Sequence, residues 1–204
     1  MIPANPSAPL RLAIMVSGGG TTMQNLAEVI ARGELNAQIV CCIASNSACF
    51  AIERAKKLNI PVEVISRKES GSLEAFSEKI TAALIKYKAD LALMAGFLSL
   101  WRIPPEYAGK VLNIHPALLP KFGGKGMHGE HVHAEVLAAG EAESGCTVHY
   151  ADNEYDHGPI ILQRRVRVLP GDTAETLAKR VFSAECEAYP DAIRKIAAEL
   201  ASKS

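Results

Sequence analysis

The sequence has no excess of either sign of charge. Lysine and arginine together number 22, aspartate and glutamate also number 22, and the formal net charge is zero. A balanced chain gives no reason to expect a surface for nucleic acid or for an anionic membrane. Long apolar runs are missing too, because no stretch approaches the roughly 20 residues needed to span a bilayer. Residues 1–10 do not read as a signal peptide, and we therefore expect a protein of the cytoplasm.

Paired motifs for disulfides or metals are also absent. No C-x-x-C pair occurs among the five cysteines, which are Cys41, Cys42, Cys49, Cys146 and Cys186. Buried free thiols in a reducing compartment are the favoured interpretation, and a nucleophile role for Cys146 has only weak support. His131 and His133 would lie on opposing sides of a helix without an acidic third ligand, so we expect no metal site.

What is present is typical of one globular domain. The 204 residues are 49% hydrophobic and 22% charged. Amphipathic helices that begin near Met23, Ala48 and Leu73 alternate with short apolar runs, which predict strands at residues 11–16, 38–44, 61–65, 91–95 and 111–116. This alternation predicts an α/β, Rossmann-like three-layer fold with a mainly parallel sheet. We expect a single domain over residues 1–204, with a disordered tail at residues 1–9.

The pattern changes after Pro116. Residues 121–129 are rich in glycine and lysine and predict a solvated loop or a lid. A short helix and two further strands, which we expect to be antiparallel, are predicted at residues 131–139, 146–151 and 159–168. Asp172 and Glu175 resemble a capping box before a long C-terminal helix, which Pro190 should kink or restart.

The strand at residues 111–116 carries two polar side chains on one face. Successive side chains of a strand point to opposite faces, so Leu112 and Ile114 share one face and Asn113 and His115 share the other. The C-terminal end of a buried strand is where α/β proteins place their chemistry. The alternative is that His115 is a core histidine with its hydrogen bonds satisfied and that Asn113 only forms a turn.

A glycine turn follows the first predicted strand. Gly18-x-Gly20 opens like a dinucleotide-binding fingerprint, but Met23 stands where the third glycine would be. The second strand ends in Ser45-Asn46, without an acid to hold a ribose diol, and no G-K-[ST] follows. A phosphate monoester is therefore the ligand that fits this turn best. The alternative is a plain strand-to-helix turn.

His115 needs a partner that sets its charge. Asp156, in a loop that Gly158 and Pro159 force to turn, is the candidate carboxylate. A carboxylate close by would raise the imidazole pKa and make His115 a cation able to donate to an oxyanion, with the Asn113 amide as a second donor. The alternative is that Asp156 only forms the turn. We expect a structural or supporting role for His149.

Three segments together resemble one enzyme family. They are residues 16–20 (V-S-G-G-G), residues 113–120 (N-I-H-P-A-L-L-P) and residues 156–161 (D-H-G-P-I-I). The chain is similar in these motifs to the phosphoribosylglycinamide formyltransferases, the folate-dependent formyltransferases of purine synthesis. The resemblance covers residues 10–197. The length favours this family over methionyl-tRNA formyltransferase and formyltetrahydrofolate hydrolase, which carry additional domains.

The resemblance implies a role for each matching position. Asn113, His115 and Asp156 match the catalytic residues of the family. The ribonucleotide substrate would contact Gly19, Gly20, Thr21, Thr22 and Glu185. The folate would contact Asn113 and the segment Leu98, Ser99, Leu100 and Trp101, with the loop at 151–156 closing over it. Two positions depart from the family pattern, because Thr22 stands in place of asparagine and Ser99 in place of arginine.

The implied reaction is transfer of the formyl group from 10-formyltetrahydrofolate to the amine of 5-phosphoribosylglycinamide, in a monomer or homodimer without a metal. Two alternatives come from other classes: a hydrolase of 10-formyltetrahydrofolate, and a non-catalytic module that binds folate or a nucleotide. A nicotinamide oxidoreductase is disfavoured, because both the third glycine and the ribose-binding acid are missing.

Overall fold

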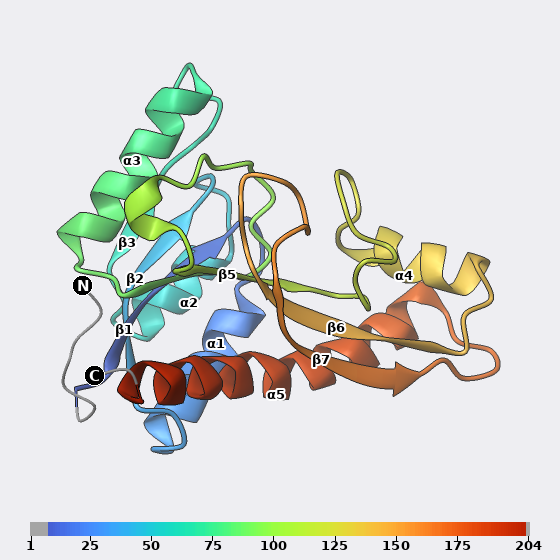
Figure 1. Ribbon diagram of the computed structural model, residues 1–204. Helices are drawn as coiled ribbons and strands as arrows, with labels where there is room; N and C mark the ends of the chain where they lie inside the picture. Colours follow the sequence, from blue (N-terminus) through green and yellow to red (C-terminus); the bar gives the residue numbers. More distant parts are fainter. Residues whose placement is uncertain (1–7, 203–204) are drawn as a thin grey trace.

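A computed structural model describes residues 8–202 of the chain (Figure 1). Seven strands form one sheet in the order β3-β2-β1-β4-β5-β6-β7. The strands are β1 (Leu10–Val16), β2 (Ala37–Ala44), β3 (Val62–Val64), β4 (Leu91–Met94), β5 (Val111–His115), β6 (Glu143–Tyr150) and β7 (Ile160–Arg167). The helices are α1 (Thr21–Ala31), α2 (Ala51–Lys57), α3 (Leu73–Lys86), α4 (Glu130–Ala138), α5 (Ala174–Ala201) and the 3₁₀ turn η1 (Pro105–Tyr107).

Alternating side chains of the central strands build two hydrophobic layers. In β1, Leu12 and Ile14 pack into the layer that α1, α2 and α5 cover, whereas Ala13 and Met15 pack into the layer under α3. Figure 1 shows α3 on one face of the sheet and α1 and α5 on the other. Because both faces are covered, the parallel strands are apolar almost throughout. The predicted α/β three-layer fold is confirmed.

The sheet is mixed, as expected. β1 to β5 pair in parallel, whereas β6 pairs antiparallel with both β5 and β7. The strand order reverses beside β1, and ligands of open α/β sheets bind at the carboxyl ends of the strands at such a point. The glycine turn after β1 and the polar end of β5 therefore lie at the same edge of the sheet.

Two predicted boundaries were wrong by about three residues. The helix expected from residue 48 begins at Ala51, because the Asn46 side chain accepts from the Ala48 N–H at 2.9 Å and holds a turn there. The strand expected at 146–151 begins at Glu143, where pairing with β7 starts. Residues 1–7 of the tail predicted at residues 1–9 lie outside the described residues.

The C-terminal helix differs from expectation in its cap and in the restart considered at Pro190. Thr173, not Asp172, caps α5, because its hydroxyl accepts from the Thr176 N–H at 3.2 Å and the Thr176 hydroxyl accepts from the Thr173 N–H at 2.9 Å. Pro190 does not restart the helix, because α5 runs through it. The Cys186 carbonyl, which proline deprives of a helical donor, accepts from the Asn25 side chain at 2.8 Å.

In Figure 1, β1 begins and α5 ends at the same side of the molecule. Within residues 8–202, no helix combines the length and the apolar character that a membrane crossing requires.

Candidate active site

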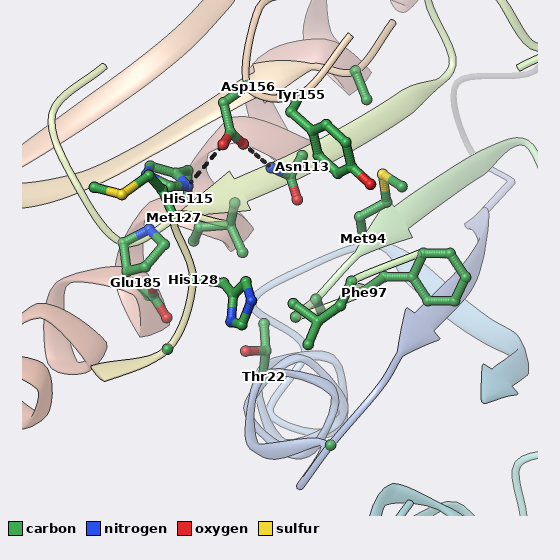
Figure 2. A pocket seen from close by; sticks show the side chains of 18 of the residues that line it. Thr22, Met94, Phe97, Asn113, His115, Met127, His128, Tyr155, Asp156 and Glu185 are labelled. Atoms are coloured by element: carbon green, nitrogen blue, oxygen red, sulfur yellow. Dashed lines mark hydrogen bonds and ion pairs between the residues drawn. The ribbon is translucent and has the colours of Figure 1, made fainter. Parts of the chain in front are cut away.

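One cavity of about 680 Å³ opens at the carboxyl ends of β1, β4 and β5. Its wall contains every residue to which the sequence assigned a role: Gly19, Gly20, Thr21, Thr22, Leu98, Ser99, Leu100, Trp101, Asn113, His115, Asp156 and Glu185. Figure 2 shows Asn113, His115 and Asp156 along one side of this space, and Thr22 and Phe97 on the other. The fold thus brings together segments that are far apart in the chain.

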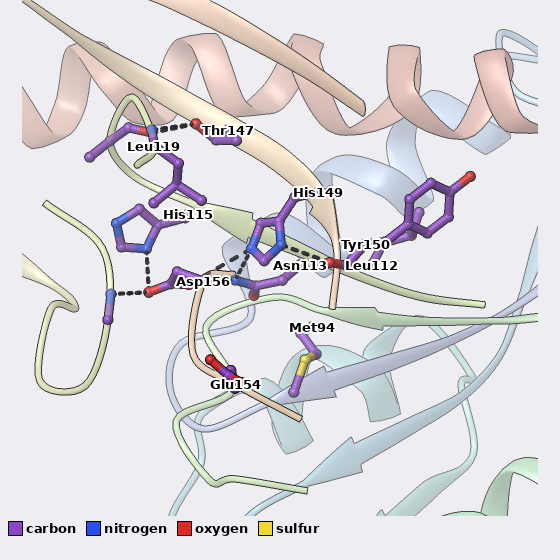
Figure 3. Close-up of polar contacts among 12 residues, drawn as sticks. Met94, Leu112, Asn113, His115, Leu119, Thr147, His149, Tyr150, Glu154 and Asp156 are labelled. Atoms are coloured by element: carbon purple, nitrogen blue, oxygen red, sulfur yellow. Dashed lines mark hydrogen bonds and ion pairs between the residues drawn. The ribbon is translucent and has the colours of Figure 1, made fainter. Parts of the chain in front are cut away.

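The Asp156 carboxylate is the centre of the polar network. Its Oδ1 accepts from Asn113 Nδ2 at 3.1 Å, and its Oδ2 lies 3.4 Å from His115 Nδ1 (Figure 3). Oδ2 also accepts from the Gly124 N–H at 2.9 Å. Asp156 has φ +53°, a left-handed conformation that aspartate tolerates better than most residues. The structure therefore places the three candidate catalytic residues in contact.

Burial and the neighbouring polar groups together determine the pKa values in this network. Burial alone raises the pKa of Asp156, but contacts with His149, His115 and the Gly124 N–H outweigh it and lower the pKa below its ordinary value. For His115, burial lowers the pKa, and the Asp156 carboxylate and the Phe122 carbonyl oppose this only in part. The expectation that Asp156 would give His115 a raised pKa was therefore wrong in its net direction, although Asp156 acts in the expected sense.

The ring nitrogens of His115 both face acceptors of the protein. Nε2 lies 2.7 Å from the Phe122 carbonyl, which can only accept, so Nε2 carries a proton. Nδ1 faces Asp156. The imidazole is 3% exposed, so its orientation is fixed by these two partners rather than by solvent.

The loop at residues 121–129 is part of this site. Phe122 and Gly124 supply a carbonyl and an N–H to the network, and a Cβ on Gly123 would lie 3.3 Å from the Asp156 Cβ and 2.5 Å from Leu119 Cδ2. Sequence reasoning treated this segment as a solvated loop or a lid, and missed its backbone contacts. The adjacent glycines were the available signal, because a side chain on Gly123 would meet Leu119 and Asp156, and Gly124 has φ +99°.

The glycine turn leaves the first turn of α1 open. Gly20 occupies the N-cap position with φ +73°, and no side chain caps the helix. Space within 4 Å is empty around a Cβ built on Gly18 or Gly19. Free N–H groups and the positive end of the helix dipole face the cavity there, an arrangement suited to an anion.

The segment Leu98–Trp101 forms the apolar end of the cavity. Trp101 is 1% exposed and packs beside Tyr107, and Leu98 is half exposed at the rim. The Ser17 hydroxyl accepts from the Leu98 N–H at 3.0 Å, and Asn153 Oδ1 accepts from the Ile103 N–H at 2.8 Å. These contacts tie the segment to the glycine turn, and tie Ile103, two residues after it, to the loop at 151–156.

Glu185 and His133 line the same cavity from α5 and α4. Burial raises the pKa of Glu185 to about 7 and lowers the pKa of His133. His133 Nδ1 is buried without a hydrogen-bond partner. Sequence reasoning considered His133 only as a metal ligand and missed its place in this wall. Within the described residues, no group of three or more His, Cys, Asp or Glu side chains is arranged to hold a metal ion.

The cysteines are free, as predicted. Cys41, Cys42, Cys49 and Cys146 are buried, and Cys186 is half buried. Burial raises the pKa of Cys146 to about 12, so its thiol is not a ready nucleophile at neutral pH.

Comparison with known proteins gives one consistent result. A family model described as formyl transferase matches residues 10–193. The chain is 39% identical over 194 residues to the chloroplastic phosphoribosylglycinamide formyltransferase of Arabidopsis thaliana, with 93% of this chain and 66% of that protein covered. It is 41% identical over 192 residues to the trifunctional purine biosynthetic protein adenosine-3 of Drosophila pseudoobscura pseudoobscura, covering 92% of this chain and 14% of that protein.

Solved structures agree. The crystal structure of phosphoribosylglycinamide formyltransferase from Brucella melitensis has a TM-score of 0.85 and 40% identity, with 93% of this chain and 96% of that chain covered. The chain spans less than two thirds of the curated relatives named above, but nearly the whole of this bacterial structure. With the family model matched across both the glycine turn and the Asn113 network, the chain belongs to the formyl transferase family, among the phosphoribosylglycinamide formyltransferases.

Proposed function

We propose that this protein transfers the formyl group of 10-formyltetrahydrofolate to the primary amine of 5-phosphoribosylglycinamide. The observation that carries the proposal is the Asp156 network with Asn113 and His115, in one cavity with an open helix N-terminus and an apolar pocket. The helix N-terminus suits the phosphate of the ribonucleotide, and the pocket at Trp101 suits the pterin. Glu185 would receive the glycinamide end.

The reaction is a direct transfer through a tetrahedral intermediate. The amine nitrogen attacks the formyl carbon, its C–N bond forms, and the carbonyl oxygen becomes an oxyanion. His115 in its protonated form donates to that oxyanion once it exchanges its hydrogen bond to the Phe122 carbonyl, and the Asn113 amide is the second donor. The nearby Asp156 carboxylate favours the His115 cation. The C–N10 bond then breaks, and the proton that the amine loses passes to N10.

The charge that develops in the reaction favours the protonated state of His115. Burial lowers the pKa of this imidazole, and the Asp156 carboxylate opposes that effect. A negative oxyanion beside the ring supplies a second opposite charge in addition to Asp156, and opposite charges raise the pKa of an imidazole. The proton is therefore stabilised where and when the negative charge develops.

Hydrolysis of 10-formyltetrahydrofolate is the second candidate. It needs no amine substrate, so it would give no use to the open helix N-terminus or to Glu185. A non-catalytic binding module would not need Asn113, His115 and Asp156 in contact. The co-substrate, the absence of a metal, a monomeric or homodimeric state and a cytoplasmic location all stay predictions from the sequence.

The test is formyl transfer measured with and without 5-phosphoribosylglycinamide, followed by absorbance of the folate product, and repeated with His115→Ala. We expect turnover that depends on the amine and is lost in the variant. Turnover that continues without the amine would favour the hydrolase. Binding of folate or nucleotide without turnover would favour the binding module.

A further inference from the structure

His149 contacts the Asn113 amide from the neighbouring strand. The two residues lie opposite one another in the register of β5 and β6, so their side chains share a face of the sheet. His149 Nε2 lies 3.1 Å from Asn113 Nδ2, and His149 is 1% exposed (Figure 3). Solvent therefore does not compete for this ring nitrogen. Whether Nε2 carries a proton decides whether it can accept a hydrogen bond from the Asn113 amide.

The partners of His149 identify which ring nitrogen holds the proton. Nδ1 lies 2.9 Å from the Tyr150 carbonyl, which can only accept, so Nδ1 carries the proton. In the neutral ring, Nε2 then has a lone pair and accepts from Asn113 Nδ2. Asn113 Nδ2 has a second acceptor, which is Asp156 Oδ1 at 3.1 Å. Both hydrogens of the Asn113 amide are thereby used.

We propose that His149 is a positioning residue that fixes the orientation of the Asn113 amide. In the tautomer protonated at Nδ1, it holds Asn113 Nδ2 toward Asp156, and Figure 2 shows the Asn113 oxygen on the other side, facing the open space. The inference rests on the proposed function, in which Asn113 donates to the oxyanion. That donation requires one hydrogen bond of Nδ2 to be exchanged for one to the oxyanion.

The bond to His149 is the exchangeable one. Hydrogen bonds to an ionised carboxylate are about twice as strong as those between neutral groups, so the Asn113 contact with Asp156 persists and the contact with neutral His149 yields. His149 thus holds the Asn113 nitrogen in the free enzyme, through a hydrogen bond that is weak enough for the oxyanion to replace.

The tautomer is measurable without any activity. Nitrogen-15 NMR of the protein labelled at histidine distinguishes a ring nitrogen that carries a proton from one that does not, and the His149 signals are assigned by their loss in His149→Gln. In these spectra we expect the proton on Nδ1 and none on Nε2. A proton on Nε2 in the free protein would overturn the proposal, even if the enzyme transfers formyl groups.

Two substitutions separate positioning from simple packing. In His149→Gln the side-chain oxygen can reach the place of Nε2 and accept from Asn113, whereas His149→Asn reaches only the place of Nδ1 and leaves that acceptor missing. We expect kcat of the glutamine variant within about threefold of the original and kcat of the asparagine variant about tenfold lower, the worth of one hydrogen bond. KM for both substrates should stay within about threefold.

Equal kcat values in the two variants, or a change confined to KM, would overturn the positioning role. If the unsubstituted enzyme fails to transfer formyl groups at all, the proposed function fails, whereas the NMR result still decides the tautomer. If His149→Asn does not fold, the nitrogen-15 spectrum of the unsubstituted protein, assigned with His149→Gln, still tests the tautomer that the proposal requires.

Discussion

Asp156 accepts a hydrogen bond from Asn113 at 3.1 Å, although 43 residues separate them in the chain. The same carboxylate lies 3.4 Å from His115 and is only slightly exposed, so one charge acts on both residues. Because the side chains of His115 and Asp156 are both largely excluded from water, a low local dielectric strengthens each of these contacts.

Replacing Asp156 with asparagine should change the pH dependence of the reaction. The Asp156 charge opposes the effect of burial on His115, so its loss should lower the pKa of His115 further. Activity needs protonated His115, so in Asp156→Asn the fall in activity with rising pH should begin at a lower pH than in the unsubstituted enzyme. We also expect kcat to be reduced at least about a hundredfold. An unaltered pH–rate profile of kcat would disprove the coupling.

Removing the Asn113 amide should remove one oxyanion donor. The loss of one such donor costs roughly 2.7–4 kcal/mol, so Asn113→Ala should lower kcat by about two to three orders of magnitude. Circular dichroism and thermal melting establish that the variant is folded. A folded variant that loses less than about tenfold would show that Asn113 does not stabilise the oxyanion.

The glycine turn supplies a matched pair of substitutions. A Cβ on Gly20 would lie 2.6 Å from the Ala51 Cβ and would strain a residue at φ +73°, whereas a Cβ on Gly19 meets nothing within 4 Å. Gly20→Ala should therefore lower the free energy of unfolding by at least about 1–2 kcal/mol, the cost of a left-handed residue. Gly19→Ala should change it by less than about 0.5 kcal/mol. Urea denaturation measures both, and equal effects would contradict the packing described.

Glu185 should make the folded protein less stable as the pH rises. Its pKa is about 7 in the folded protein and 4.5 ordinarily, so between these values the folded state keeps a proton that the unfolded state loses. The contribution of Glu185 is thus fully present below about pH 4.5 and is lost as the pH rises toward 7, by up to about 3 kcal/mol.

Glu185→Gln isolates this effect, because glutamine does not titrate. Urea denaturation at several pH values gives the free energy of unfolding of both proteins. The value for the unsubstituted protein minus the value for Glu185→Gln should fall from pH 4.5 to pH 7 and then level off. A difference that is constant across this range would mean that Glu185 titrates at its ordinary value in the folded protein.

Asn25 and Pro190 should be energetically coupled. Asn25→Ala leaves the Cys186 carbonyl without its donor and should cost about 1–3 kcal/mol of stability. In a Pro190→Ala background the new N–H of residue 190 can satisfy that carbonyl, so the same substitution at Asn25 should cost less. A double-mutant cycle measured by denaturation gives the coupling, and a value near zero would separate the two residues.

Local pattern was enough for most of the fold. The apolar runs and helical spacings identified every long element, since burial on both faces of the sheet demands them. The alternation at residues 111–116 correctly separated Leu112 and Ile114 from Asn113 and His115. Two errors fell where a side-chain contact decides a boundary, as Asn46 does before α2 and as Thr173 does at the start of α5. A third fell where pairing with β7 decides the start of β6.

By itself the sequence determined the composition of the site, which consists of a glycine turn that can bind an anion and a polar pair at the end of a buried strand. Only the tertiary structure decided which groups meet. The antiparallel pairing of β5 with β6 sets His149 opposite Asn113, and the loop at 121–129 brings Phe122 and Gly124 to His115 and Asp156. The charge of His115 was decided the same way, because burial is a property of the whole fold and no local pattern encodes it.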